Sequence, residues 1–283
     1  MILNPKEVSV REFHQFLTAT VAPRPIALAS TIDKQGRVNL SPFSFFNVFG
    51  ANPPTAIFCP AKSGRTNTHK HSYENVKETM EAVINIVNYP MVQQISLAST
   101  TYDKGVNEFI KSGLTPIPSE MVKPPRVKES PVQLECKVKE VVELGDGPGA
   151  GNLIISEIVL MHINEDYLDE NGKIDQHKID LIGRLGTDYY VRASGDALFT
   201  VPKPILTKGI GVDQLPENIR TSSILTGNDL GMLGNIEKLP TEVEITAYTK
   251  NNPIPESWEG KQKFAQKLLS ETKVSEAIKV LLS

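Results

Sequence analysis

The sequence predicts a mainly β protein, an antiparallel β-barrel with peripheral helices and a C-terminal extension. Several short strand-like segments follow one another with few helices between them, which favours a barrel over a sheet covered by helices on both faces. Two segments, residues 132–139 and the second half of 153–162, alternate apolar and polar side chains as half-buried strands do. The Gly-rich loop between them, residues 145–151, precedes a strand and not a helix, so we expect a hairpin connection and no phosphate-binding loop.

The elements before this pair are delimited by turn residues and apolar runs. Asp33 begins and Gly36 ends a segment between two strand signals, and these residue types favour a tight reversal. Pro53 and Pro54 interrupt the chain directly before another strand signal. In chain order, the sequence predicts a helix at 10–20, strands at 24–32, 37–41 and 55–59, a helix at 69–80, a strand at 82–87 and a helix at 90–99.

The pattern of residues changes near residue 195, and we therefore predict a barrel domain at 1–195 and an extension at 196–283. We expect the extension to pack on the barrel or on a dimer partner. Its Gly-rich segment at 226–231 predicts irregular structure. A final helix is predicted by apolar residues at helical spacing, namely Phe264, Leu268, Leu269, Ala277, Ile278 and Leu281.

Composition excludes several classes of protein. The formal net charge of the 283 residues is -3, so the chain offers no broad basic surface to nucleic acid. No apolar run approaches the ~20 residues of a membrane helix, and the charged N-terminus does not resemble a signal peptide. Cys59 and Cys136 lie in apolar segments, which predicts buried thiols and fits a cytoplasmic location. The five histidines have no zinc-site spacing, so we expect no metal.

The N-terminal hairpin carries the strongest functional signal. Its first arm, residues 24–31, alternates apolar and small residues, whereas residues 39–46 alternate hydroxyls with aromatic rings. Hydroxyls and main-chain amides suit a phosphate group, and rings suit a flat aromatic ligand. The hairpin therefore predicts a cradle for a phosphorylated planar cofactor.

Ordered motifs identify a family resemblance over roughly residues 15–190. They are Arg24-Pro25-Ile26, the 39–46 run, Pro53-Pro54, Gly105-Val106-Asn107-Glu108-Phe109, Gly113-Leu114-Thr115, Leu134-Glu135-Cys136 and Gly183-Arg184-Leu185. In this order they resemble the flavin reductase-like family of FMN-binding split-barrel proteins, which includes flavoredoxin. The resemblance implies a six-stranded Greek-key split barrel, a homodimer, and FMN held non-covalently near the dimer interface. It also implies an oxidoreductase that reduces flavin with NADH or NADPH and passes electrons to an acceptor.

The chain departs from this family in one motif. Many members carry Lys-Asp-Thr after the third strand, whereas this chain has Ser63-Gly64-Arg65-Thr66-Asn67-Thr68. A cation and a threonine are retained, and the adjoining helix N-terminus also suits an anion. We therefore predict that Arg65, Thr66, Asn67 and Thr68 bind the FMN phosphate, with Lys70 beside them. A solvated loop with turn-forming residues is the alternative.

The resemblance implies further contacts with the flavin. Arg24 is expected to reach the pyrimidine edge of the ring or the phosphate, with a surface salt bridge as the alternative. Neighbouring strand residues alternate in direction, so Phe43, Phe45 and Phe46 cannot all face a ring, and some are core. The complete predicted cofactor site is Arg24, Ala29, Ser30, Thr31, Asn39, Ser41, Pro42, Phe43, Ser44, Phe45, Arg65, Thr66, Asn67, Thr68, Lys70 and Tyr102.

No catalytic side chain is expected, because hydride transfer from a nicotinamide to a flavin is direct and the cofactor carries the chemistry. The first alternative function is a non-enzymatic FMN electron carrier, followed by a pyridoxamine-phosphate oxidase type and a ligand-binding barrel without redox activity. The Gly, Asn and Asp residues of the extension favour close turns, so we expect it to narrow access to the flavin. The choice between NADH and NADPH is left open.

Overall fold

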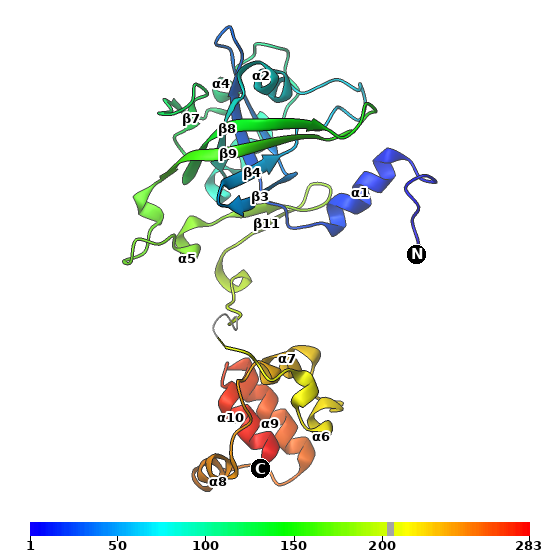
Figure 1. Ribbon diagram of the computed structural model, residues 1–283, viewed down its shortest axis with the longest axis vertical. Coiled ribbons are helices and arrows are strands. Elements are labelled where there is room, and N and C mark those ends of the chain that lie inside the picture. The colour runs from blue at the N-terminus through cyan, green and yellow to red at the C-terminus, as the bar shows by residue number, and fades with distance from the viewer. Residues whose placement is uncertain (203–206) are drawn as a thin grey trace. The chain divides into compact units, whose positions relative to one another are not determined.

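The computed structural model describes residues 1–202 and 207–283 and divides the chain into two compact units, Met1–Phe199 and Thr200–Ser283 (Figure 1). The first unit contains the predicted strands, and the second is helical. Each unit has a hydrophobic core of its own. The packing of the second unit on the barrel or on a partner stays a prediction.

A seven-stranded antiparallel sheet forms the first unit, with the strand order β2-β1-β5-β8-β9-β4-β3. Its strands are β1 (Ala27–Ile32), β2 (Val38–Phe43), β3 (Phe46–Ala51), β4 (Pro54–Phe58), β5 (Glu81–Ile86), β8 (Val132–Glu143) and β9 (Asn152–Ile163). The loop at 145–151 joins the antiparallel pair β8 and β9, as predicted. The antiparallel β-rich class is therefore confirmed for this unit.

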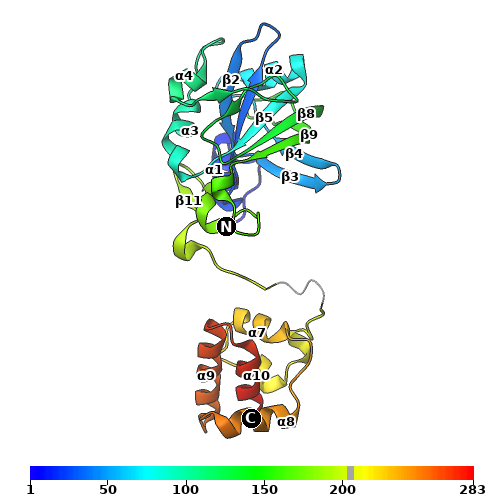
Figure 2. The ribbon, with the colours of Figure 1, turned by 90° about the vertical axis from the view of Figure 1, so that its left-hand side faces the viewer.

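The sheet differs from the predicted six-stranded barrel in two respects. The chain breaks at Ser44 and Phe45, so the single arm expected at 39–46 becomes two strands, β2 and β3. These successive strands pair with different neighbours and occupy the two edges of the sheet. Because the edges do not hydrogen-bond to each other in the described parts of the chain, the sheet is not closed (Figure 2).

The hairpin between β1 and β2 forms as the turn residues predicted. The Asp33 carboxylate accepts hydrogen bonds from the main-chain N–H groups of Gln35 and Arg37, and Gly36 adopts a φ of +83°. The side chain of Arg37 completes the turn with an ion pair to Asp33. These bonds fix the register that pairs Ala29 with Ser41.

Short helices and two small hairpins surround the sheet, and the helices predicted at 10–20, 69–80 and 90–99 are confirmed within a few residues. These elements are α1 (Val10–Thr20), α2 (His71–Thr79), η1 (Tyr89–Met91), α3 (Val92–Ala98), α4 (Glu108–Ser112), η2 (Glu165–Tyr167), α5 (Gln176–Ile179), η3 (Gly195–Ala197), the pair β6 (Pro116–Ile117) and β7 (Arg126–Val127), and the pair β10 (Ile182–Arg184) and β11 (Tyr190–Arg192).

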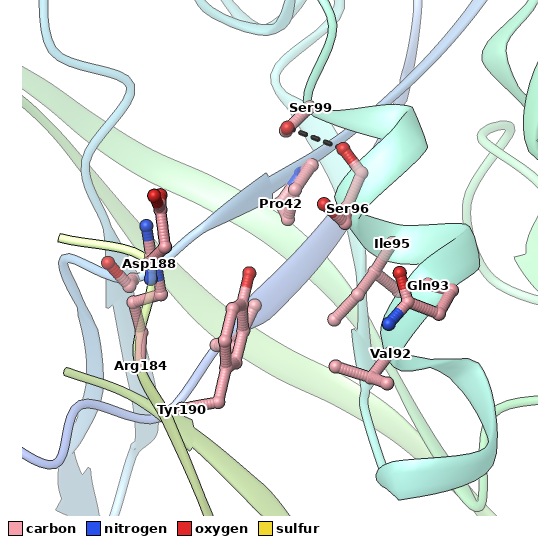
Figure 3. Close-up of a pocket in the computed structure, with 11 residues that line it drawn as sticks. Pro42, Val92, Gln93, Ile95, Ser96, Ser99, Arg184, Asp188 and Tyr190 are labelled. Atoms are coloured by element: carbon pink, nitrogen blue, oxygen red, sulfur yellow. Dashed lines mark hydrogen bonds between the residues drawn. The ribbon is translucent and has the colours of Figure 1, made fainter.

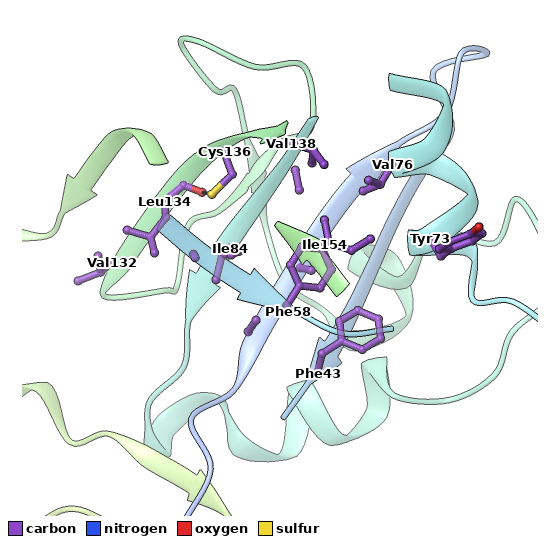
Figure 4. Packing of buried hydrophobic residues seen from close by; sticks show 14 of the residues in the cluster. Phe43, Phe58, Tyr73, Val76, Ile84, Val132, Leu134, Cys136, Val138 and Ile154 are labelled. Atoms are coloured by element: carbon purple, nitrogen blue, oxygen red, sulfur yellow. Dashed lines mark hydrogen bonds between the residues drawn. The ribbon is translucent and has the colours of Figure 1, made fainter. Parts of the chain in front are cut away.

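The core of the sheet explains which aromatic residues stay available for a ligand. Phe43 and Phe58 pack with ring centroids 5.6 Å apart among aliphatic side chains (Figure 4). Phe45 lies in the bend between β2 and β3 and is 41% exposed, so the break in the strand leaves this ring outside the core that holds Phe43. Cys59 and Cys136 are buried free thiols, as predicted, and burial raises the pKa of Cys136 to about 12.

The second unit is a helical bundle, where the sequence predicted an irregular segment followed by one helix. The Gly-rich segment at 226–231 enters a helix because Thr226 and Asp229 form a capping box, which satisfies the first main-chain N–H groups. Its elements are η4 (Val212–Gln214), α6 (Glu217–Arg220), α7 (Gly227–Gly234), α8 (Glu242–Asn251), α9 (Trp258–Ser270) and α10 (Val274–Leu282). Among the described residues, no helix of either unit has the length and apolar character required to cross a membrane.

Candidate functional site

Three adjoining cavities form a groove on the first unit. The loop cavity has a volume of about 290 Å³, the central cavity about 410 Å³ and the outer cavity about 490 Å³. Ser99 lines all three, while Ser41 and Lys70 line both the loop and central cavities. Pro42, Ser44 and Arg184 line both the central and outer cavities, so the walls are shared from one end of the groove to the other.

The loop cavity contains most of the predicted phosphate cluster. Ser63 shapes this segment, because its Oγ accepts the main-chain N–H groups of Arg65 at 3.3 Å and Thr66 at 3.2 Å. The hydroxyls of Thr66 and Thr68 lie 2.8 Å apart. Arg65 and Lys70 both line the cavity, and neither has a carboxylate within 4.0 Å in the described parts of the chain. The structure therefore brings together two cations and several hydroxyls.

Asn67 differs from the prediction. It adopts a left-handed φ of +56°, and its Nδ2 donates to the main-chain carbonyl of Asp146 at 3.0 Å. Lys62 Nζ donates to the same carbonyl at 3.1 Å. Asn67 therefore braces the loop against the β8–β9 hairpin, and its side chain does not line the loop cavity.

The start of helix α2 borders the loop cavity and leaves polar groups without protein partners. Lys70 occupies the N-cap position without a capping side chain, and His71 and Ser72 of the first turn line the cavity. His69 stacks on Tyr73 with ring centroids 4.1 Å apart, and its buried Nδ1 has no hydrogen-bond partner among the described residues. Free main-chain N–H groups at a helix N-terminus favour an anion.

The floor of the loop cavity is rigid. Asn39 Nδ2 donates to Ser72 Oγ at 3.0 Å, and buried Glu108 accepts the main-chain N–H of Leu40 at 2.9 Å. Burial raises the pKa of Glu108, although the hydrogen bond from Leu40 opposes the shift. Tyr102 also lines the loop cavity, and the Lys111 ammonium lies 5.6 Å from its ring centroid.

Arg24 lines the central cavity, and its contact with the flavin stays a prediction. The alternative, a surface salt bridge, is wrong, because the side chain is buried and has no carboxylate within 4.0 Å among the described residues. The side chain is only 7% exposed. Four of its five N–H groups donate within the protein, to the main-chain carbonyls of Thr18, Val21 and Leu185 and to Ser44 Oγ. Burial and the nearby charge of Arg184 lower the pKa of Arg24. Arg24 therefore joins the end of α1 to the segment after β10.

Ala29, Ser30 and Thr31 are not brought to the groove. All three are completely buried in β1, and none lines the three cavities. The Thr31 hydroxyl accepts Asn75 Nδ2 at 3.1 Å. Strand β1 lies between β2 and β5 and is buried along nearly its whole length, which is why its small residues pack against neighbours instead of exposing the backbone.

The central cavity has a wall made by the turn between β2 and β3. Ser41, Pro42, Phe43, Ser44 and Phe45 all line it. The ring of Phe45 packs edge-on against His14 of α1, with centroids 6.1 Å apart. A mixed wall of hydroxyls, proline and aromatic carbon suits a flat heteroaromatic ring.

The outer cavity lies between helix α3 and the β10–β11 hairpin (Figure 3). Arg184 and Tyr190 of the hairpin face Val92, Ile95 and Ser96 of the helix across it. The sequence indicated Arg184 only as part of a family motif, and its place in the groove was not predicted. The charged residue in a Gly-Arg-Leu motif is the signal that could have identified it.

Comparisons with known proteins agree with the fold of the first unit. The sequence model described as "Flavin reductase like domain" matches residues 20–178. An uncharacterised protein of Aquifex aeolicus is 37% identical over 196 residues, which cover 69% of this chain and 97% of the relative.

Two solved structures are similar over the same share of the chain. Component B of nitrilotriacetate monooxygenase from Bacillus cereus has a TM-score of 0.66 and 29% identity, covering 71% of this chain and 98% of that one. A split-barrel-domain protein of Shewanella frigidimarina has a TM-score of 0.60 and 29% identity, with coverage of 72% and 99%. Within the residues described here, no group of three or more His, Cys, Asp or Glu could hold a metal ion.

Proposed function

The chain belongs to the flavin reductase-like domain family, and from this premise we propose that the groove binds FMN and that the protein is an NAD(P)H-dependent flavin reductase. The proposed reductase passes electrons from the flavin to an acceptor. The residues of the loop and central cavities support FMN as the bound cofactor.

The observation that carries the proposal is the set of polar groups left over at the loop cavity. Arg65 and Lys70 have no carboxylate within 4.0 Å in the described ranges, and His69 Nδ1 is buried without a partner there. A buried polar atom without a partner costs free energy, and a bound phosphate would accept hydrogen bonds from the two cations and, when His69 Nδ1 carries a proton, from this nitrogen. The open N-terminus of α2 favours the same negative charge.

The central cavity fits the flavin ring of the same molecule. It shares Ser41 and Lys70 with the loop cavity, so one ligand can extend from one to the other. The Ser41 and Ser44 hydroxyls can donate to the polar edge of the ring, while Phe43 and Phe45 offer apolar contact. When bound, the flavin supplies the hydride-accepting chemistry, and the residues of the groove hold and orient it.

The proposal includes a homodimer. Edge strand β3 exposes Val48 by 58% and Phe49 by 65%, an arrangement that invites pairing with another chain. Phe45, 41% exposed, lies between this edge and the central cavity. A second copy covering β3 would therefore also shield the ring end of the groove from water.

The test is a titration of the purified chain with FMN, followed by assays with NADH and NADPH. We expect a yellow complex at micromolar FMN and steady oxidation of one of the nucleotides with free flavin as acceptor. A colourless protein that does not bind FMN would contradict the cofactor. A yellow protein that fails to turn over either nucleotide would indicate the electron-carrier alternative.

A further inference from the structure

We propose that the outer cavity binds a second ligand, a planar ring that carries an oxyanion, and that Arg184 is its anchor. The inference rests on the proposed function, because it concerns the ligand that meets the flavin of the loaded protein. The second ligand is inferred from the residues of the outer cavity, whereas FMN binding is supported by those of the loop and central cavities.

Most N–H groups of the Arg184 guanidinium have no acceptor among the described residues, in contrast to those of Arg24. One hydrogen bond within the described chain uses its guanidinium, from Nη1 to the main-chain carbonyl of Tyr189 at 3.0 Å. No carboxylate of the described residues lies within 4.0 Å of it. Arg24, whose pKa is lowered partly by this neighbour, adds a second positive charge to the region. A guanidinium with free N–H groups binds carboxylate or phosphate oxygens in a bidentate manner.

The position of Arg184 is fixed before any ligand binds. Its main-chain N–H and carbonyl both pair with Arg24, at 2.8 and 3.0 Å. Its guanidinium carbon lies 4.7 Å from the centroid of the Tyr190 ring. These contacts hold the cation against the hairpin, so little side-chain freedom is lost when an anion binds.

The walls of the outer cavity suit a flat ring. Tyr190 stands on one side, while Val92 and buried Ile95 provide apolar surface on helix α3 (Figure 3). Ser96 and Gln93 add polar groups at the same helix. Aromatic and aliphatic surfaces facing each other favour a planar aromatic ligand.

The outer cavity also adjoins the place proposed for the flavin ring, because Pro42, Ser44 and Arg184 line both cavities. Asp188 is the acidic residue of the outer cavity, and it lies on the same hairpin as Arg184. Its negative charge opposes an anionic ligand, so the balance between Arg184 and Asp188 sets the affinity.

Calorimetry on the FMN-loaded chain tests the proposal with two probes, oxidised nicotinamide dinucleotide (NAD⁺ and NADP⁺) and benzoate. The first carries phosphate oxyanions and the second a carboxylate, so the two arms distinguish the sources of the anion. We expect binding in at least one arm, weakened roughly tenfold by Arg184→Gln and strengthened several-fold by Asp188→Asn. Arg184→Lys, which keeps the charge but not the fork, should fall between wild type and Arg184→Gln.

The flavin absorbance of each variant is titrated in parallel and separates the two hypotheses. Intact FMN binding, with no heat from either probe or with probe affinities that neither variant changes, would overturn the assignment of Arg184. Failure of the wild type to bind FMN would instead refute the proposed function, and the second-ligand site with it. Asp188→Asn keeps the test valid should Arg184→Gln fail to fold.

Discussion

The two parts of the proposed FMN site, the central cavity as its strand end and the loop cavity as its loop end, are built in different ways. At the strand end, Arg24 is buried, and four of its N–H groups are taken by the protein. At the loop end, Arg65 is exposed, and His69 Nδ1 is left without a partner among the described residues. The strand end is therefore held in shape by hydrogen bonds within the protein, whereas the loop end presents polar groups for which the described chain supplies no partner. Two arginines that line one groove can therefore be placed in opposite ways, one with its donors used within the protein and one with its side chain exposed.

The largest expected effect comes from Arg24→Met, which tests whether the hydrogen bonds of Arg24 stabilise the strand end. The change leaves the carbonyls of Thr18, Val21 and Leu185 without their donor. We expect the free energy of unfolding of the first unit to fall by about 3 kcal/mol, because hydrogen bonds to a charged group are the strong ones.

The measurement uses urea unfolding followed by two signals. Trp258 is the single tryptophan of the chain and lies in the second unit, so tryptophan fluorescence reports on that unit alone. Circular dichroism reports on both units. Arg24→Met should lower the dichroism midpoint and leave the fluorescence midpoint unchanged, while Arg11→Ala on exposed α1 should change neither. An unaltered dichroism midpoint would show that Arg24 is not structural.

A smaller effect is expected from Thr68→Val at the loop end. The variant removes one of the two paired hydroxyls that face the proposed phosphate site. The loss of one hydrogen bond to the charged phosphate should raise the dissociation constant of FMN by roughly tenfold without changing the unfolding midpoint. The matched control is Thr55→Val on β4, outside the groove, which should leave FMN affinity unchanged. Equal effects of both variants would argue against a phosphate at this end.

The pH dependence of Glu108 tests the rigid floor of the loop end. Burial raises its pKa in the folded protein, so the folded state binds a proton more readily than the unfolded state. Its contribution to stability is therefore present below the ordinary glutamate pKa and is lost as the pH rises through the raised value.

Glu108→Gln removes this titration and can still accept the N–H of Leu40. We expect the variant to have a higher free energy of unfolding than wild type at about pH 7, and this difference should disappear at about pH 4. Unfolding midpoints at the two pH values provide the measurement. A difference that is the same at both pH values would contradict the buried, titrating carboxylate.

The smallest effect is expected from ending the chain after Phe199. Because the two units have separate cores, the truncated chain should fold and bind FMN with an unchanged dissociation constant. The expectation that the second unit narrows access to the flavin predicts a faster rate or altered nucleotide preference on truncation. An unchanged rate and preference in the folded truncated chain would refute that gating role.

Sequence patterns predicted the parts of the molecule that depend on local physics. The turn at Asp33 and Gly36 and the β8–β9 hairpin follow from residue types at fixed spacing. The separation of β2 from β3 could not be predicted in this way, because it depends on which neighbour each strand meets far along the chain. The spacing of Thr226 and Asp229 could have predicted the capping box, but the glycines around them favoured an irregular segment instead.

In the candidate site, too, the sequence predicted the contacts between near neighbours in the chain and missed those between distant residues. Arg65, Thr66 and Thr68 are adjacent in sequence, so their convergence on one cavity needs only a short loop. The saturation of Arg24 by three main-chain carbonyls depends on residues as distant as Leu185, which no local pattern reveals. The role of Arg184 likewise depends on the packing of its hairpin opposite α3.

The central claim is that the loop end binds the phosphate of FMN, and a comparison of FMN with riboflavin tests it most directly. Riboflavin has the same ring and no phosphate, so wild type should bind FMN on the order of 100-fold more tightly. Arg65→Ala should reduce this preference roughly tenfold and leave riboflavin affinity unchanged. Equal wild-type affinities for the two flavins, or an Arg65→Ala variant that weakens both alike, would contradict the account.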